Sequence, residues 1–150
     1  MDRIEQIKNT ARQLIEQGDL NIVNSAFSAD YVAHAGQKTH NGHKFIKQFT
    51  KQLRTAMPDI KIVKIEILFI SDNVLTWQRT LSGTHQAALR GIPASNKKIK
   101  WYEIVVSRFN NDKIAEEWVA SDLAFQLMLK LKQKAEPLTA TAIYAAHLGL

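Results

Sequence analysis

The chain has 150 residues, 45% of them hydrophobic, which suits one compact domain with a sizeable core. It contains no cysteine, so disulfide bonds and thiolate metal sites are excluded. The net charge of +6 is spread along the chain without a nucleic-acid-binding motif, so we expect no nucleic-acid partner.

The chain shows neither a membrane span nor an export signal. No apolar run approaches the roughly 20 residues that a bilayer-spanning helix needs. The stretch MDRIEQIKNTARQL at the amino terminus is charged and lacks the apolar centre of a signal peptide. We therefore expect a cytoplasmic protein with no membrane partner.

The amino-terminal part has the apolar spacing of helices. Gly18 is a natural stop for the first helix, and Pro58 ends the last one. The predicted helices cover residues 2–17, 19–27 and 44–57, with a loop or short strand over residues 31–43.

After Pro58 the pattern alternates and β-branched residues become frequent, which predicts strands. Four strands are expected at residues 60–70, 74–85, 98–109 and 114–120, followed by a helix over residues 122–135. This order predicts an α+β fold, in which helices pack on a curved antiparallel sheet and close a cone with an internal pocket. We expect one domain over residues 1–135 and a tail over residues 136–150.

A charged residue falls on the inward face of the second predicted strand. Arg79 shares that face with Trp77, and symmetrical pairing of the central strands places Glu103 near it. A buried charge needs a partner, so an ion pair between Arg79 and Glu103 is expected. A purely structural ion pair and a shifted register remain open beside a role in ligand binding.

The histidines offer weaker candidates. His34 and His85 each end a segment that should open onto the cone, and either can be a pocket residue or an exposed loop residue. His40 and His43 have a chelating spacing, but they lie in a glycine-containing loop without a neighbouring carboxylate. We therefore expect no metal site.

The stretch EEWVASDLAFQLM, residues 116–128, carries a carboxylate where the last strand passes into the last helix. Ser121 or Asp122 suits the cap of that helix. In an apolar pocket near Trp118 and Phe125, burial would instead raise the pKa of the Asp122 carboxyl group and make it a better base. The sequence leaves both roles open.

Taken in order, several stretches resemble the SnoaL-like polyketide cyclases and their ester-cyclase relatives, within the nuclear transport factor 2-like superfamily. These stretches are QGDLNIVNSAFSADYVAHAG, AMPDIKI, LSGTHQAALRGIP and FNNDKIAEEWVASDLAFQLM, and the resemblance covers about residues 3–131. It implies the cone fold and a cofactor-free intramolecular aldol condensation with Asp122 as acid and base. It also implies assembly into dimers or tetramers through the outer face of the sheet.

The chain departs from the family pattern at several positions. The loop reads GIPASN where GIPPTG is common, and Arg79 stands where an aromatic residue is frequent. The second polar partner of the aspartate is not fixed, with Tyr102, Glu103 and Arg108 as candidates.

We predict a small enzyme that performs cofactor-free acid/base chemistry on a hydrophobic carbonyl compound, with Asp122 as the catalytic residue. A binding module that holds a small ligand in the same cone is the alternative, and an interaction protein with a filled cone is a third. The predicted substrate-binding residues are His34, Trp77, Arg79, His85, Ile92, Tyr102, Glu103 and Trp118.

The outer face of the sheet is the predicted contact between subunits. Alternation in IKIVKIEILFI leaves Ile60, Ile62, Leu68 and Ile70 opposite the presumed core residues. Because an apolar outer face is usually an interface, we expect a homodimer or a higher homo-oligomer.

Overall fold

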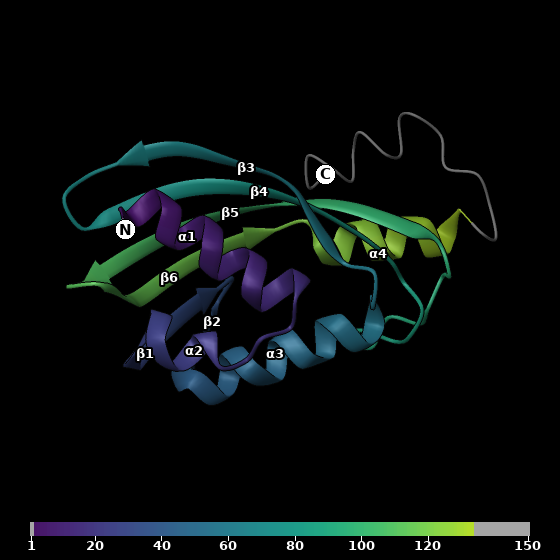
Figure 1. Cartoon of the computed structure of the whole chain (residues 1–150). Coiled ribbons are helices and arrows are strands. Elements are labelled where there is room, and N and C mark those ends of the chain that lie inside the picture. The colour runs from purple at the N-terminus through teal and green to yellow at the C-terminus, as the bar shows by residue number, and fades with distance from the viewer. Residues whose placement is uncertain (1, 134–150) are drawn as a thin grey trace.

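The fold was obtained as a computed structural model that describes residues 2–133 (Figure 1). Its helices are α1 (Arg3–Ala11), the π-helical turn η1 (Arg12–Glu16), α2 (Ile22–Ala26), α3 (Gly42–Ala56) and α4 (Leu123–Lys132). Helices α1 to α3 lie against one side of a curved sheet, and α4 follows the last strand along the chain. This arrangement confirms the predicted α+β fold, while the predicted tail lies outside the described residues.

The sheet has six strands, two more than the predicted meander. They are β1 (Phe27–Ala35), β2 (Lys38–Asn41), β3 (Lys61–Ile70), β4 (Val74–Thr84), β5 (Lys98–Asn110) and β6 (Lys113–Ser121). The spatial order is β2-β1-β6-β5-β4-β3, so the sheet has two open edges. All neighbours pair antiparallel except β1 and β6, which run parallel. No helix among residues 2–133 is long and apolar enough to span a membrane.

The first helical segment begins at a capping aspartate and is followed by a glycine in the left-handed conformation. The Asp2 side chain accepts a hydrogen bond from the Glu5 N–H and so caps α1. The chain leaves η1 through Gly18, whose φ of +69° is the left-handed conformation that glycine adopts without strain. Arg54 of α3 donates to the carbonyl oxygens of Ile15 and Glu16 at 2.5 and 2.7 Å, and so ties α3 to the end of η1.

The pairing of β4 with β5 confirms the predicted register, because Arg79 lies directly opposite Glu103. Side chains on these strands alternate between a buried inner face and a more exposed outer face. The inner face of β5 carries Trp101, Glu103 and Val105, all buried beneath the helices. The strand period therefore brings charged groups into the apolar core together with its aromatic residues.

Of the four residues around β3 that were predicted to lie on the outer face, two are buried, so this prediction is wrong for them. Ile60 and Ile62 are buried in the core, whereas Leu68 and Ile70 are exposed. The pairing of β3 with β4 is irregular at two places, between Ile62 and Lys64 and again further along the strand. Each bulge inserts a residue and reverses the alternation that follows, so one period does not describe the whole strand.

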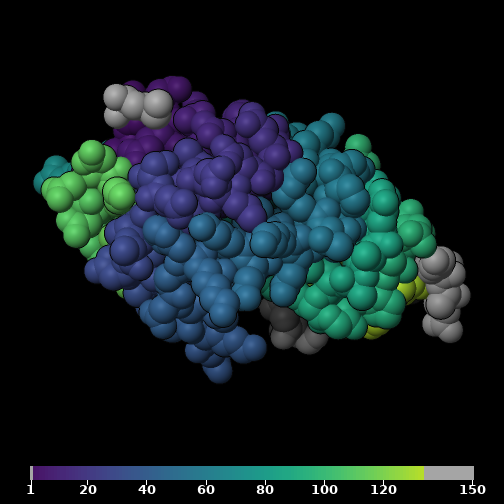
Figure 2. Space-filling model, turned by 60° about the horizontal axis from the view of Figure 1, so that its bottom comes forward, coloured from purple at the N-terminus to yellow at the C-terminus, as the bar shows by residue number. Residues whose placement is uncertain are grey.

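The connection between β4 and β5, residues 85–97, packs beside the end of α3 (Figure 2). The Gln86 N–H donates to the Ala56 carbonyl oxygen at 2.8 Å, and the Asn96 N–H donates to the His85 carbonyl oxygen at the same distance. Leu89 and Ile92 close a tight turn by donating to each other's carbonyl oxygens at 3.0 and 2.9 Å. The connection is thus held to α3 by its backbone.

Gly83 on β4 packs closely against Met57 and Ile60, the residues that follow α3. A Cβ atom at Gly83 would lie 3.0 Å from the Met57 Cβ and 3.4 Å from the Ile60 Cα, which cannot move aside easily. Replacing Gly83 with valine should lower the free energy of unfolding by about 1–3 kcal/mol through overpacking. Urea denaturation measures this, with the exposed Lys100→Ala as a control expected to stay within about 0.5 kcal/mol of the wild type. Equal stability of Gly83→Val and the wild type would contradict the prediction.

Candidate active site

A cavity of about 370 Å³ lies between the helices and the inner face of the sheet. This volume is near the lower end of the range for small-molecule sites, so it suits a small ligand. Most of the lining is apolar. The lining residues are Ile7, Thr10, Ala11, Leu14, Ile15, Phe27, Tyr31, Ala33, Ala35, Gly36, Phe45, Ile46, Phe49, Thr50, Leu53, Trp77, Arg79, Arg90, Glu103, Ile114, Glu117, Val119 and Ser121.

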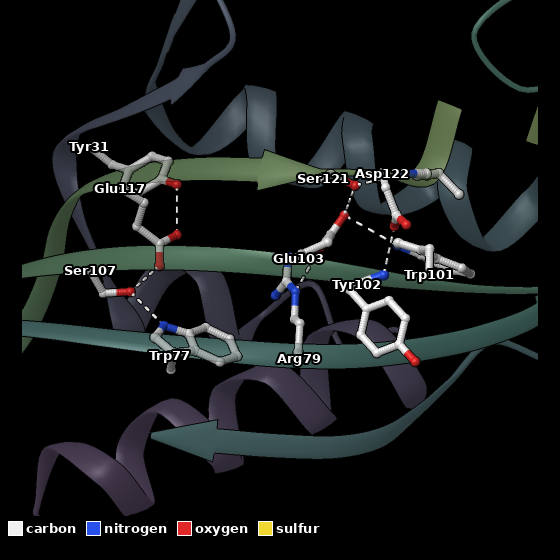
Figure 3. Close-up of polar contacts among 11 residues, drawn as sticks. Tyr31, Trp77, Arg79, Trp101, Tyr102, Glu103, Ser107, Glu117, Ser121 and Asp122 are labelled. Carbon is white, nitrogen blue, oxygen red and sulfur yellow. Dashed lines mark hydrogen bonds and ion pairs between the residues drawn. The ribbon is translucent and has the colours of Figure 1, made fainter. Parts of the chain in front are cut away.

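One polar cluster in the cavity is built on the ion pair between the half-buried Arg79 and the buried Glu103 (Figure 3). Arg79 donates from Nε and Nη2 to Glu103 Oε1 at 2.8 and 2.7 Å. The other carboxylate oxygen, Oε2, accepts from Trp101 Nε1 at 3.3 Å and from Ser121 Oγ at 2.8 Å. Glu103 is therefore surrounded by donors, as a buried carboxylate must be.

Arg79 still has donors to offer a ligand. The remaining N–H groups of its guanidinium make no hydrogen bond within residues 2–133, and the side chain lines the cavity. The guanidinium carbon lies 5.2 Å from the centroid of the Trp77 ring, which also lines the cavity and steadies the cation. Arg79 can therefore donate to a carbonyl or enolate oxygen while it stays paired with Glu103.

A second cluster surrounds Glu117 on β6, at some distance along the strands from the first cluster (Figure 3). Ser107 Oγ donates to Glu117 Oε2 at 2.5 Å, and the Tyr31 hydroxyl donates to Oε1 at 2.8 Å. Trp77 Nε1 donates to the Ser107 hydroxyl at 3.0 Å. Because an indole N–H can only donate, Trp77 directs the Ser107 proton toward Glu117.

Burial raises the pKa of the Glu117 carboxyl group above its ordinary value, since its direct partners within residues 2–133 are neutral hydroxyls. The two hydroxyl hydrogen bonds and the nearby Arg79 charge oppose that rise only in part. Burial also raises the pKa of Tyr31, and the adjacent Glu117 raises it further. A carboxyl group with a raised pKa is a stronger base than an ordinary glutamate, so Glu117 is suited to accept a proton and return it.

The two interior carboxyl groups thus have different surroundings. Glu103 is held by a cation and two further donors, whereas Glu117 is held by two neutral hydroxyls. Two carboxyl groups in contrasting environments commonly take different roles in acid/base chemistry. Here Glu117 has the features of a proton-transfer group, and Glu103 has those of a residue that positions Arg79.

Three of the predicted ligand-binding residues lie together in the cavity, namely Trp77, Arg79 and Glu103. Five others, His34, His85, Ile92, Tyr102 and Trp118, do not line it. Tyr102 and Trp118 project from the outer face of the sheet, since they alternate with the inward Glu103 and Glu117.

His34 also lies on the outer face, stacked on Trp118 with ring centroids 5.1 Å apart. Its Nε2 lies 2.6 Å from Glu116 Oε2, and Arg108 Nε donates to Glu116 Oε1 at 3.1 Å. The hydrogen bond with His34, together with the Arg108 contacts, lowers the pKa of Glu116. These side chains form a surface network on the opposite side of the sheet from the cavity.

His85 and Ile92 belong to the connection beside α3. The His85 side chain has no exposed surface, and its burial lowers the pKa of the imidazole, which favours the neutral form. Ile92 closes the turn that begins at Leu89, but the neighbour that reaches the cavity is Arg90.

Asp122 occupies the N-cap position of α4 without a side-chain capping bond, and it does not line the cavity. Its Oδ1 accepts from the Tyr102 N–H at 2.8 Å, and its Oδ2 accepts from Gln126 Nε2 at 3.2 Å. The Leu123 N–H is taken instead by the Ser121 hydroxyl at 3.2 Å. Asp122 therefore joins β5 to α4, while its neighbour Ser121 faces the cavity.

Glu117, Tyr31 and Ser107 are site residues that were not predicted from the sequence. The signal was present in the doublet Glu116-Glu117, because adjacent residues of a strand face opposite sides, so one of the two had to point inward. Ser107 shares the inward face of β5 with Glu103, four residues earlier. Tyr31 lies on a strand expected only as a loop or short strand, and nothing local marks it.

Residues 2–133 contain no cluster of three or more histidine, aspartate or glutamate side chains arranged to hold a metal ion. The polar groups of the cavity are organised around hydrogen bonds and one ion pair.

The family model for SnoaL-like polyketide cyclases matches residues 5–128. No curated protein matches the chain by sequence. The chain is similar in structure to a candidate polyketide cyclase from Acidithiobacillus ferrooxidans, with a TM-score of 0.76 and 21% identity over 87% of this chain and 94% of that one.

Two further solved structures are similar. For AclR, a candidate hydroxylase from Streptomyces galilaeus, the TM-score is 0.74 and the identity is 18%, over 87% of this chain and 96% of that one. For an NTF2-like protein from Anabaena variabilis, the TM-score is 0.65 and the identity is 13%, over 79% of this chain and 85% of that one. At these identities the likeness establishes the nuclear transport factor 2-like fold.

The raised pKa of Glu117 predicts how stability depends on pH. Above the ordinary glutamate pKa of about 4.3, the unfolded chain releases this proton more readily than the folded chain. Glu117 therefore lowers the free energy of unfolding as the pH rises from that value through its folded pKa. Glu117→Gln removes this loss, so the variant should gain stability relative to the wild type, by about 1.4 kcal/mol for each unit by which the pKa is raised.

Urea denaturation at a series of pH values between about 4 and 8 measures this difference. The matched control is Glu5→Gln, because Glu5 is exposed on the first turn of α1. Its stability should follow the wild type across the series. Parallel curves for Glu117→Gln and the wild type would contradict the assignment of Glu117 as a group with a raised pKa.

Proposed function

Because the chain belongs to the SnoaL-like polyketide cyclase family, we propose that it catalyses cofactor-free proton transfer on a small hydrophobic carbonyl compound held in the cavity. The observation that carries this proposal is Glu117, a carboxyl group buried in an apolar cavity with only neutral hydroxyls bonded to it among residues 2–133. Arg79, a cation with unused N–H groups, lines the same cavity.

The proposed reaction begins at the carbon next to the ligand carbonyl. Glu117 takes a proton from this carbon, and the electrons of the broken C–H bond form an enolate whose oxygen accepts hydrogen bonds from Arg79. Fixed donors in a dry site stabilise such an oxyanion better than water does, because they need not reorient. The Tyr31 hydroxyl donates to Glu117 Oε1, so it lies beside the carboxyl group that takes the proton from the ligand and later gives it back.

An aldol ring closure follows from the same groups. The enolate carbon attacks a second carbonyl carbon of the same molecule, so that one C–C bond forms and one C=O bond becomes an alkoxide. The alkoxide then receives the proton that Glu117 holds, which leaves no net change in redox state or in the number of protons. The cavity wall would fold the ligand so that the two carbons meet, and orientation of this kind can lower the barrier substantially.

Asp122 stays a prediction as the catalytic base, supported by its family position. Its carboxylate is held by the Tyr102 N–H and by Gln126, so it would have to leave both partners to reach a ligand. Glu117 needs no such movement, because it already lines the cavity. If Glu117 is the base, its substitution should abolish activity; if Asp122 is the base, substitution of Asp122 should do so instead.

The test follows exchange of the α-protons of α-tetralone for deuterium in D₂O by NMR, a readout of proton abstraction from a bicyclic ketone. Glu117→Gln should slow protein-catalysed exchange by two orders of magnitude or more, the usual scale for loss of a general base. Asp122→Asn should change the rate less than twofold, because asparagine can keep the hydrogen bond from the Tyr102 N–H. The opposite pattern would identify Asp122 as the base.

A ligand-binding module without turnover is the second candidate. It is favoured by the completeness of the Arg79–Glu103 cluster, in which both carboxylate oxygens have donors before any ligand arrives. This reading predicts that α-tetralone binds in the cavity while its exchange proceeds at the rate seen without protein. Calorimetry beside the exchange measurement separates the two candidates.

We also propose that the chain assembles as a homodimer or larger through the outer face of β5 and β6. Tyr102, Ile104 and Trp118 are 45%, 43% and 41% exposed, and they project from these two neighbouring strands. Ile104 pairs with Ala120, and Val106 pairs with Trp118, so these apolar side chains form one surface. Exposed apolar surface of this kind is typical of an interface.

The assembly proposal predicts the behaviour of one double variant. Ile104→Glu with Trp118→Glu should convert the oligomer to a monomer at micromolar concentration, because two charges would be buried in the contact. Sedimentation velocity measures this. Met128→Glu on α4, another exposed apolar position, serves as the control and should leave the oligomer intact. A wild-type protein that is monomeric at the same concentration would refute the proposal.

A further inference from the structure

The turn between Leu89 and Ile92 places an arginine at the mouth of the cavity. Arg90 and Gly91, its two central residues, have φ values of +53° and +75°, and the two end residues exchange backbone hydrogen bonds. Turns with two left-handed residues favour glycine, asparagine and aspartate, because other side chains are strained there. An arginine in this conformation is an outlier that calls for a functional reason.

The turn that carries Arg90 is anchored to the core and to α3. Leu89 is buried in the core and anchors the turn, while Gln86 ties the start of the connection to α3. The guanidinium carbon of Arg90 lies 5.6 Å from the centroid of the Phe49 ring on α3. Arg90 is exposed to solvent and also lines the cavity, so its side chain reaches from the surface into the opening.

Arg90 has no hydrogen bond or ion pair with any residue in 2–133. The other arginine of the cavity, Arg79, is neutralised by Glu103. Arg90 is thus the uncompensated positive charge among the described residues that line the cavity, in a chain with a net charge of +6. A cation over an aromatic face keeps the edge of its guanidinium free, and this edge fits the two oxygens of a carboxylate.

From these observations we infer that the ligand carries a carboxylate, which Arg90 binds at the mouth of the cavity while the apolar body and the carbonyl group lie inside. The substrate class is then an aromatic or alicyclic keto acid. Arg90 determines specificity and takes no part in proton transfer, and the positive chain draws such anions toward the opening. This inference rests on the proposed function, because it assigns the orientation of a ligand in the same cavity.

The test compares benzoylpropionate, a phenyl ketone with a carboxylate, with its uncharged methyl ester. Isothermal titration calorimetry should give the wild type an affinity about tenfold higher for the acid than for the ester, the scale of a partly exposed charge-assisted hydrogen bond. Arg90→Gln should bring this ratio close to one without changing the affinity for the ester. Arg90→Lys should keep part of the preference, because it retains the charge without the planar fork.

Lys100→Gln is the matched control, since it removes one positive charge from an exposed position that does not line the cavity. It should leave the ratio unchanged. Equal affinities for acid and ester in the wild type, or an unaltered ratio in Arg90→Gln, would overturn the inference while ligand binding in the cavity stands. Binding of neither compound would count against the cavity as a site for carbonyl ligands, and would overturn the inference with it.

Discussion

The need to neutralise Arg79 inside an apolar cavity constrains much of this structure. A cation that is largely enclosed in an apolar cavity needs a carboxylate beside it, and Glu103 supplies one from directly across the β4–β5 pairing. A shift of one residue between these strands would turn Glu103 to the outer face and leave Arg79 alone. The ion pair therefore selects the register, and the register decides which other side chains of β4 and β5 face the ligand space. Trp77 and Ser107 reach the Glu117 cluster through the same alternation.

The sequence was sufficient for features that depend on a local period. The order of the helices and of the four strands after Pro58 follows from spacing, and the opposition of Arg79 and Glu103 follows from symmetrical pairing about one connection. The parallel contact of β1 with β6 joins segments about eighty residues apart and leaves no mark in either segment. The bulges of β3 could not be predicted either, because an inserted residue changes which side chains face inward without requiring a distinctive residue type. At Asp122 the strand ends, and alternation no longer tells where a side chain points.

The site illustrates that proteins with the same fold can carry different chemistry. Solved structures that share this architecture are described as a candidate cyclase and a candidate hydroxylase, at identities that establish only the fold. What distinguishes one member from another is the set of side chains that a common cone presents to its interior. Here that set contains two carboxyl groups and one compensated cation in an apolar enclosure, and an uncompensated cation at its mouth. Because Glu103 and Glu117 have different hydrogen-bond partners, the two ends of the cavity differ in chemical character.

The bulged strand β3 has a consequence beyond the cavity, because it forms an edge of the unclosed sheet. Such an edge offers free backbone donors and acceptors to any extended segment of another chain. Each half contains a bulge, but only the first half carries lysines, Lys61 and Lys64, whose charges discourage such pairing. Its second half ends in Leu68, Phe69 and Ile70, which are all exposed and uncharged. Protection against intermolecular strand addition is therefore uneven along one strand, and aggregation of the native protein would begin at the end that adjoins the β3–β4 turn.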